Sequence, residues 1–162
     1  MAETSAAGPA FGHAIDLDAL PGYCIRRLNQ IAVAIFLQET EPQAITPVQY
    51  GCLQAVANTP GMDQRTLART IGIDTSTIGG VVDRLEARGL LERKPRPDDR
   101  RVRLLSITSE GLKLLRAVRP GMLRAQQRML DPLTPHQREQ FMQMLRAIIV
   151  ENNAASRAPN EG

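Results

Sequence analysis

The chain has 162 residues, of which 43% are hydrophobic but only 3% aromatic, with no tryptophan, and its formal net charge is +3. This length is typical of one domain with an aliphatic core, and the mildly basic balance, carried mostly by arginine, permits an anionic partner without requiring one. No apolar run reaches membrane-spanning length, no signal-peptide pattern is present, and the two isolated cysteines indicate neither zinc nor disulfides, so we expect a cytoplasmic protein without membrane, metal or cofactor.

Residues 1–14 are small, contain glycine and proline and lack periodicity, so we expect a mobile N-terminal arm. Residues 15–45 carry a helical pattern with two apolar faces, which is typical of a helix buried against more than one neighbour. The residues of the first face are Leu20, Cys24, Leu28, Ile31 and Ile35. The second face surrounds Phe36.

Residues 46–108 contain three shorter helices and a hairpin. Each helix has a capping residue at its start, and these are Thr46, Asp63 and Asp74. The last two helices are joined by Gly72-Ile73-Asp74 and form a helix-turn-helix pattern. The second of them, residues 74–89, would be a recognition helix that enters the major groove of double-stranded DNA.

The recognition helix has one apolar face, formed by Ile78, Val81, Val82 and Leu85. At about 100° per residue, the opposite face presents Ser76, Gly80 and Asp83. We therefore expect this helix to contact DNA through a set of small or cationic residues. The set is Thr75, Ser76, Thr77, Gly79, Gly80 and Arg84.

A hairpin follows, with strands predicted at 90–94 and 101–107 around the loop PRPDD. Six basic residues crowd into residues 93–108. Arginines at such a tip, here Arg96, Arg100 and Arg101, can enter the minor groove, where the negative potential attracts guanidinium groups. Asp99 can hold one arginine extended through a bidentate pair. The alternative is an exposed, salt-bridged loop that binds nothing.

Residues 109–151 contain two more helices, one from Thr108 to about residue 130 and one that opens at Thr134-Pro135. Both carry apolar stripes, and Pro120-Gly121 should kink the first. Residues 152–162 resemble the N-terminal arm in composition and should form a flexible tail. The predicted fold is mainly α with a small β-hairpin wing beside a helix-turn-helix.

Residues 67–111 closely resemble the MarR family of bacterial transcription regulators. The matching motifs are Leu67-Ala68, D-x-S-T, V-D-R-L-E, GLLER, D-D-R-R and L-x-S-I-T-x-x-G, together with TPVQYGCL at 46–53. The resemblance implies a nucleoid-associated homodimer, interlocked by residues 15–45 and 109–151, that grips palindromic operator DNA through residues 46–108. It also makes Asp99 and Arg101 the wing-tip pair, and it implies a repressor that a small aromatic acid releases.

The recognition helix departs from the family at Gly80, where many members carry a large polar residue. Two adjacent glycines weaken a helix. One interpretation is a weak helix that packing tolerates. The other is that bare backbone lets the helix approach the groove closely.

The effector site is predicted from residues that combine a cation with a ring. The candidates are Tyr23, Arg26, Arg27 and Tyr50. An arginine could bind the carboxylate, and a tyrosine could contact the ring. The recognition helix is similar to that of regulators of aromatic and nicotinate-type acid breakdown, which favours benzoate, salicylate or hydroxynicotinate. Alternatively, these four residues are interface or surface groups.

Two other functions remain open. Some relatives sense peroxide through a first-helix cysteine, but Cys24 shares a stripe with Leu20 and Leu28, so we expect a buried structural thiol. A winged helix can also bind proteins instead of DNA, although such a module does not need an arginine-bearing tip. An enzyme is not expected, because only two histidines are present and no phosphate-binding glycine loop occurs.

Overall fold

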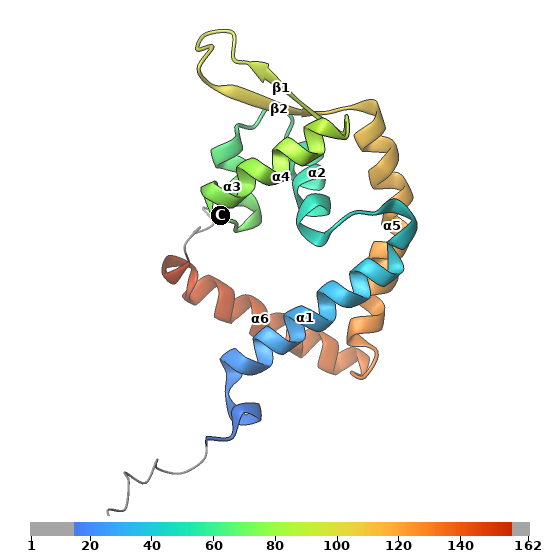
Figure 1. Cartoon of the computed structure of the whole chain (residues 1–162). Helices are drawn as coiled ribbons and strands as arrows, with labels where there is room; N and C mark the ends of the chain where they lie inside the picture. Colours follow the sequence, from blue (N-terminus) through green and yellow to red (C-terminus); the bar gives the residue numbers. More distant parts are fainter. Residues whose placement is uncertain (1–14, 157–162) are drawn as a thin grey trace, which may run out of the picture.

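The computed structural model describes residues 15–156. These residues form a mainly helical protein with one antiparallel hairpin, which confirms the predicted fold class (Figure 1). The longer elements are α1 (Pro21–Glu39), α2 (Pro47–Asn58), α3 (Gln64–Ile71), α4 (Thr75–Ala87), β1 (Leu91–Pro95), β2 (Arg103–Ile107), α5 (Ser109–Leu130) and α6 (Pro135–Glu151). Short 3-10 turns are η1 (Leu17–Ala19), η2 (Glu41–Gln43) and η3 (Asn153–Ala155). The N-terminal arm and residues 157–162 of the predicted tail lie outside the described residues.

The helix starts follow the predicted capping residues. The side chains of Thr46, Asp63, Asp74, Thr108 and Thr134 each accept a hydrogen bond from a backbone amide in the first turn of the helix that follows. Gly72 ends α3 with φ 68°, and Gly89 follows α4 with φ 70°, which are left-handed conformations that glycine adopts without strain. Local sequence therefore determines where most of these helices begin and end.

The hydrophobic core is centred on the helix-turn-helix and the hairpin, drawn at the top of Figure 1, and it extends to Phe36 on α1 and to Leu115, Val118 and Ala125 on α5. It is almost entirely aliphatic, as the composition predicts, and Phe36 is its one buried aromatic among the described residues. The predicted apolar face of the recognition helix is confirmed, because Ile78, Val81, Val82 and Leu85 are all buried. Burial of that face turns the opposite face of α4 outward.

The hairpin is anchored to the helix-turn-helix at its base. Arg93 pairs with Leu105 across the strands, and β2 also bonds to the segment before α3 through Leu105 N to Met62 O, 2.8 Å. Strand β1 lies one residue later than predicted and reaches Pro95, whereas β2 begins only at Arg103 and ends at Ile107 as predicted. Arg101 therefore lies in the turn instead of the return strand.

Helix α1 approaches α5 at Gly121. A Cβ built on Gly121 would lie 2.2 Å from the Glu39 carbonyl oxygen, so only glycine permits this contact. The Glu39 carboxylate accepts from Arg124 Nε at 2.9 Å and from Arg128 Nη1 at 3.3 Å. The Arg124 hydrogen bond is the main reason that the pKa of Glu39 is lowered. Helix α5 continues through Pro120 without interruption. Of the Pro120-Gly121 pair, Gly121 permits the close contact with α1.

The helix-turn-helix and hairpin, residues 46–108, are called the winged domain below. The segment that enters it after α1 and the segment that leaves it before α5 both contact the end of α4. Arg88 donates to the carbonyl oxygen of Ala44, 3.0 Å, in the segment that follows α1. Thr108, which precedes α5, donates its hydroxyl to the Gly89 carbonyl oxygen at 2.7 Å and its amide to that of Leu90 at 3.2 Å. Residues 88–90 are thus hydrogen-bonded to both connecting segments, through the Arg88 guanidinium on one side and the Gly89 and Leu90 carbonyl oxygens on the other.

Helices α1 and α6 leave large apolar side chains uncovered. Helix α6 buries no residue within the described protomer, and Met144, Ile148 and Ile149 are each more than half exposed. The expected burial of Cys24 is wrong for the single chain, because its thiol is exposed and donates to the Asp18 carbonyl oxygen at 3.2 Å. None of the described helices is long and apolar enough to cross a membrane.

Candidate nucleic-acid interface

The N-terminal turn of α4 presents three hydroxyl residues, Thr75, Ser76 and Thr77, all exposed. The Asp74 carboxylate accepts from the backbone amide and hydroxyl of Thr77, both at 2.9 Å, and from the Ser76 hydroxyl. The Ser76 bond is the largest of the causes that lower the pKa of Asp74 to about 2. Two of the three hydroxyl protons are therefore donated to Asp74, so the Ser76 and Thr77 hydroxyls present mainly acceptor lone pairs to solvent.

The two glycines of α4 are not required by the fold. A Cβ at Gly80 would meet only the end of the flexible Arg84 side chain, 3.6 Å away, and a Cβ at Gly79 would lie 3.4 Å from Gln64 Nε2. Neither glycine has a positive φ. Arg84 is exposed, and its guanidinium end lies beside Gly80.

The wing tip leaves two arginines free. Within the described residues, neither Arg100 nor Arg101 forms a side-chain hydrogen bond or ion pair, and both are exposed. The predicted bidentate pair of Asp99 with an arginine is not formed. Asp99 Oδ1 instead accepts from the Arg101 backbone amide at 3.0 Å, which shapes the turn. Arg96 lies near Asp98, with Nε 3.8 Å from Oδ1, and is half-buried.

One basic residue of the wing faces inward. Arg93 donates to Asp83 Oδ1 at 2.6 Å, to Gln64 Oε1 at 3.2 Å and to Glu86. Burial lowers the pKa of Arg93, but the hydrogen bonds to Asp83 and Glu86 outweigh it, so the pKa is raised. The strand alternation indicates this orientation, because Arg93 is two residues from the buried Leu91 and on the same face.

Helix α3 contributes a cation that sequence reasoning missed. Gln64, Arg65, Thr75 and Ile78 line a hollow of about 370 Å³ between the first turns of α3 and α4. Arg65 is exposed there, beside the hydroxyl residues of α4. The signal was its place in the first turn of the helix that precedes the recognition helix.

The predicted effector residues fall into two separate places. Arg26 lies over the Tyr23 ring, 5.0 Å from its centroid, near the start of α1, and Arg27 is exposed beside it. Tyr50 instead lines a cavity of about 380 Å³ between α2 and α5, and neither Tyr23, Arg26 nor Arg27 lines that cavity.

The Tyr50 cavity has its own cations. Its lining residues are Tyr50, Gln54, Ala57, Leu112, Leu115, Arg116, Arg119 and Met122. Burial raises the pKa of Tyr50, and the positive charge of Arg119 partly offsets this. Arg116 and Arg119 form no side-chain hydrogen bond or ion pair among the described residues. The cavity therefore combines an apolar wall, a half-buried phenol and two unpaired guanidinium groups, which suits a small aromatic anion.

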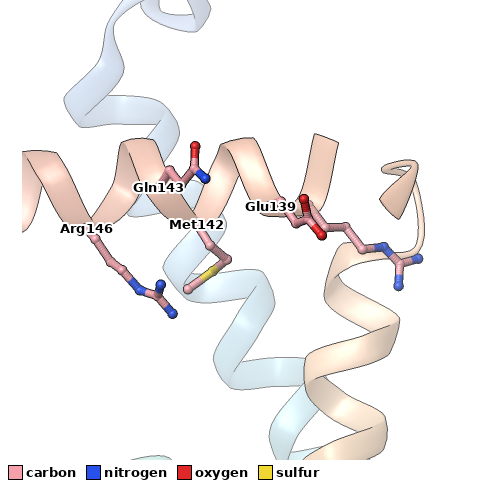
Figure 2. Close-up of a pocket in the computed structure, with 5 residues that line it drawn as sticks. Glu139, Met142, Gln143 and Arg146 are labelled. Carbon is pink, nitrogen blue, oxygen red and sulfur yellow. The ribbon is translucent and has the colours of Figure 1, made fainter. Parts of the chain in front are cut away.

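Another hollow, of about 360 Å³, lies on α6 (Figure 2). Arg138, Glu139, Met142, Gln143 and Arg146 line it, all from a single helix. A small molecule there would be contacted from one side only, so this hollow is a poor ligand site. No group of three or more potential metal ligands occurs in residues 15–156.

This chain is similar in sequence and fold to known transcription regulators. The MarR family model matches residues 45–102. The PcaV transcriptional regulator of Streptomyces coelicolor, solved with its natural ligand, is 37% identical, with a TM-score of 0.78, over 84% of this chain and 96% of that one.

Two further solved structures are similar. The repressor CouR of Rhodococcus jostii RHA1, bound to a 23-mer DNA duplex, is 29% identical, with a TM-score of 0.77, over 88% of this chain and 99% of that one. BpsR of Bordetella bronchiseptica, whose DNA binding is regulated by 6-hydroxynicotinic acid, is 29% identical, with a TM-score of 0.79, over 84% of this chain and 97% of that one.

Proposed function

Because the chain belongs to the MarR family of transcription regulators, we propose that it is a homodimeric repressor that a small aromatic acid releases from a palindromic operator. The observation that carries the proposal is the combination of an outward α4 face with a wing tip on which the Arg100 and Arg101 side chains have no partner within residues 15–156. The repressor CouR, which shares this fold, is bound to a DNA duplex.

DNA binding would use two kinds of contact. The first turn of α4 brings Thr75, Ser76 and Thr77 to base edges in the major groove, where hydroxyl acceptors can take hydrogen bonds from adenine or cytosine amino groups. Gly79 and Gly80 leave the backbone bare, and Arg84 supplies a cation beside them.

The wing supplies the second kind of contact. Arg100 and Arg101 would enter the minor groove, Arg96 would stand beside them, and Asp99 would hold the tip in shape. Arginine contacts to phosphates contribute affinity with little sequence preference. Affinity should therefore depend strongly on salt concentration.

Dimerisation would cover the apolar surface that one protomer leaves open. Helix α6 buries nothing in the single chain, and α1 leaves Ile25 and Ile31 about half exposed. A contiguous exposed apolar surface is typical of a protein–protein interface. Light scattering should give about twice the 17.8 kDa of one chain. A folded monomer at micromolar concentration would contradict the proposed architecture.

The effector would bind in the Tyr50 cavity. BpsR, a relative of similar fold, responds to 6-hydroxynicotinic acid. Arg119 and Arg116 are the carboxylate anchors that the cavity offers, and Tyr50 is the ring contact. Arg26, Arg27 and Tyr23 stay candidate ligand residues on α1, where a second protomer would have to complete a site. Linkage requires that the acid and DNA weaken each other by the same factor.

The test begins with duplexes that the protein selects from a random pool. Fluorescence anisotropy of the selected duplex should show tight binding that falls steeply with salt concentration. Failure to select any duplex at low salt would refute DNA binding and favour the protein-interaction module.

Calorimetry with benzoate, salicylate and hydroxynicotinate then tests the effector. Arg119→Ala should abolish binding, whereas Lys113→Ala, on the same helix but paired with Glu110, should not. If Arg26→Ala and Arg27→Ala abolish binding and Arg119→Ala does not, the site is on α1 and the cavity is excluded. If none of the acids binds, the aromatic-acid proposal fails.

The second candidate function is a thiol sensor, and the exposure of Cys24 is the observation that favours it. Accessibility is one requirement for a reactive thiol. In the described protomer the Cys24 Sγ donates a hydrogen bond to the Asp18 carbonyl oxygen. Cys24→Ser separates the two: a sensor loses its response to peroxide in the DNA-binding assay, and an acid-responsive repressor behaves as the wild type.

A further inference from the structure

Arg93 stands apart from the other cations of the wing because it faces the helices. Residues along β1 alternate between two faces, so Arg93 shares its face with the buried Leu91, while Glu92 and Lys94 point to the other side and pair with each other at 2.6 Å. The Arg93 side chain is only 21% exposed. The Arg93 side chain therefore points toward the helices and is mostly covered by them.

Three elements of the winged domain meet at this guanidinium. Its Nη2 donates to Asp83 on α4 at 2.6 Å and to Gln64 on α3 at 3.2 Å, and its Nη1 donates to Glu86. The second carboxylate oxygen of Glu86 accepts from the Arg93 backbone amide at 3.2 Å. Glu86 thus holds both the main chain and the side chain of β1, which fixes a rotation as well as a distance.

The acids of this cluster stand where DNA would repel them. Asp83 projects from the face of α4 opposite to the core, and its side chain is 68% exposed. Carboxylates near a phosphate backbone oppose binding unless a cation neutralises them. Two carboxylates, Asp83 and Glu86, surround the single guanidinium of Arg93. Their net negative charge would weaken DNA binding, unless the cluster also strengthens binding through the geometry of the wing.

We propose that Arg93 is a positioning residue that fixes the wing relative to the recognition helix, so that the tip arginines and the first turn of α4 reach their two grooves together. Arg93 itself does not touch DNA in this proposal. The inference rests on the proposed DNA binding. It adds a residue that acts by holding the wing tip and the first turn of α4 in a fixed relative position.

A matched pair of variants gives opposite signs for the two explanations. Glu86→Gln and Glu92→Gln each remove one negative charge, but only Glu86 contacts Arg93. If charge alone matters, both variants bind the selected duplex more tightly. If Arg93 positions the wing, Glu86→Gln turns an amide N–H toward the guanidinium and weakens binding on the order of tenfold, within the range for residues of one ion-pair network. Glu92→Gln should bind as the wild type or slightly more tightly.

A double-mutant cycle tests whether Arg93 works through the wing. Arg93→Met keeps the apolar stem and removes the guanidinium. In that background Arg101→Ala should cost much less than in the wild type, because the tip is already misplaced. Full additivity would mean that the two residues act independently and would overturn the proposal.

Folding is separated from positioning by thermal melting and by titration of the active fraction. If wild-type protein selects no duplex, the proposed function fails and this inference falls with it. If the wild type binds but Glu86→Gln binds at least as tightly, only the positioning role is refuted, even where the variant melts at a lower temperature. Weaker binding by Glu86→Gln with an unchanged active fraction, together with non-additivity in the cycle, supports the proposal.

Discussion

Gly121→Ala should destabilise the protein, although alanine is the better helix former. Propensity alone would favour the variant by roughly 1 kcal/mol. The added Cβ, however, would lie 2.2 Å from the Glu39 carbonyl oxygen and 3.1 Å from its carbon. Real Cβ contacts under 3.0 Å essentially do not occur, and this neighbour is backbone that cannot rotate away. Helices α1 and α5 must therefore separate.

Overpacking of this kind costs about 1–3 kcal/mol, and a clash with helix backbone belongs at the upper end. The net destabilisation is then about 2 kcal/mol, which should lower Tm by roughly 4–8 °C for a chain of this size. Separation of the helices also stretches the bonds from Arg124 and Arg128 to Glu39, which adds to the loss.

The measurement is a thermal melt by circular dichroism at one fixed protein concentration, because the stability of a dimer depends on concentration. Gly80→Ala is the matched control, since its Cβ meets only the mobile end of Arg84. It should raise the stability by about 0.5–1 kcal/mol. If Gly121→Ala melts at or above the wild-type temperature, the close contact between α1 and α5 does not constrain the protein.

Three further predictions concern the wing tip and helix α4. Arg101→Ala should weaken binding to the selected duplex by about 1–3 kcal/mol with an unchanged melting curve, and unchanged affinity would mean that the tip does not reach DNA. Gly80→Arg should change the sequence that the protein selects, and recovery of the same operator would refute close approach at that position. Asp74, whose folded pKa is lowered to about 2, stabilises α4 fully above its unfolded value of 3.8 and loses this as pH falls toward 2. Asp74→Asn keeps the cap without titrating, so melting at stepwise lower pH should show a smaller acid loss from this site in the variant.

Much of the fold could be predicted because its signals are local. A capping side chain bonds to an amide three residues ahead, so Asp63 and Asp74 mark helix starts without any tertiary information. The apolar face of α4 follows from periodicity in the same way. These features depend on neighbours within one or two turns of the chain.

What could not be predicted depends on contacts between distant segments. Asp99 was expected to pair with an arginine side chain, but the turn brings a backbone amide closer. Arg119 enters the Tyr50 cavity from a helix that starts about sixty residues later in the chain. Cys24 shares an apolar stripe, yet no part of residues 15–156 covers it, so periodicity could not show whether this thiol is buried.

The segments that lead from α1 and into α5 are both hydrogen-bonded to residues 88–90, which form a fixed point at one end of α4. The 13 residues of α4 span about 18 Å from this fixed end to the turn that carries Ser76. A rotation of about 10° at the fixed end would move the far turn by about 3 Å, which is the full length of a hydrogen bond. Because Ile78, Val81, Val82 and Leu85 hold α4 in the core along its length, such a rotation would carry the helix-turn-helix and the hairpin with it as one body. Under the proposed function, a small change in the spacing of α1 and α5 would therefore be enlarged at the first turn of α4, which would face the bases.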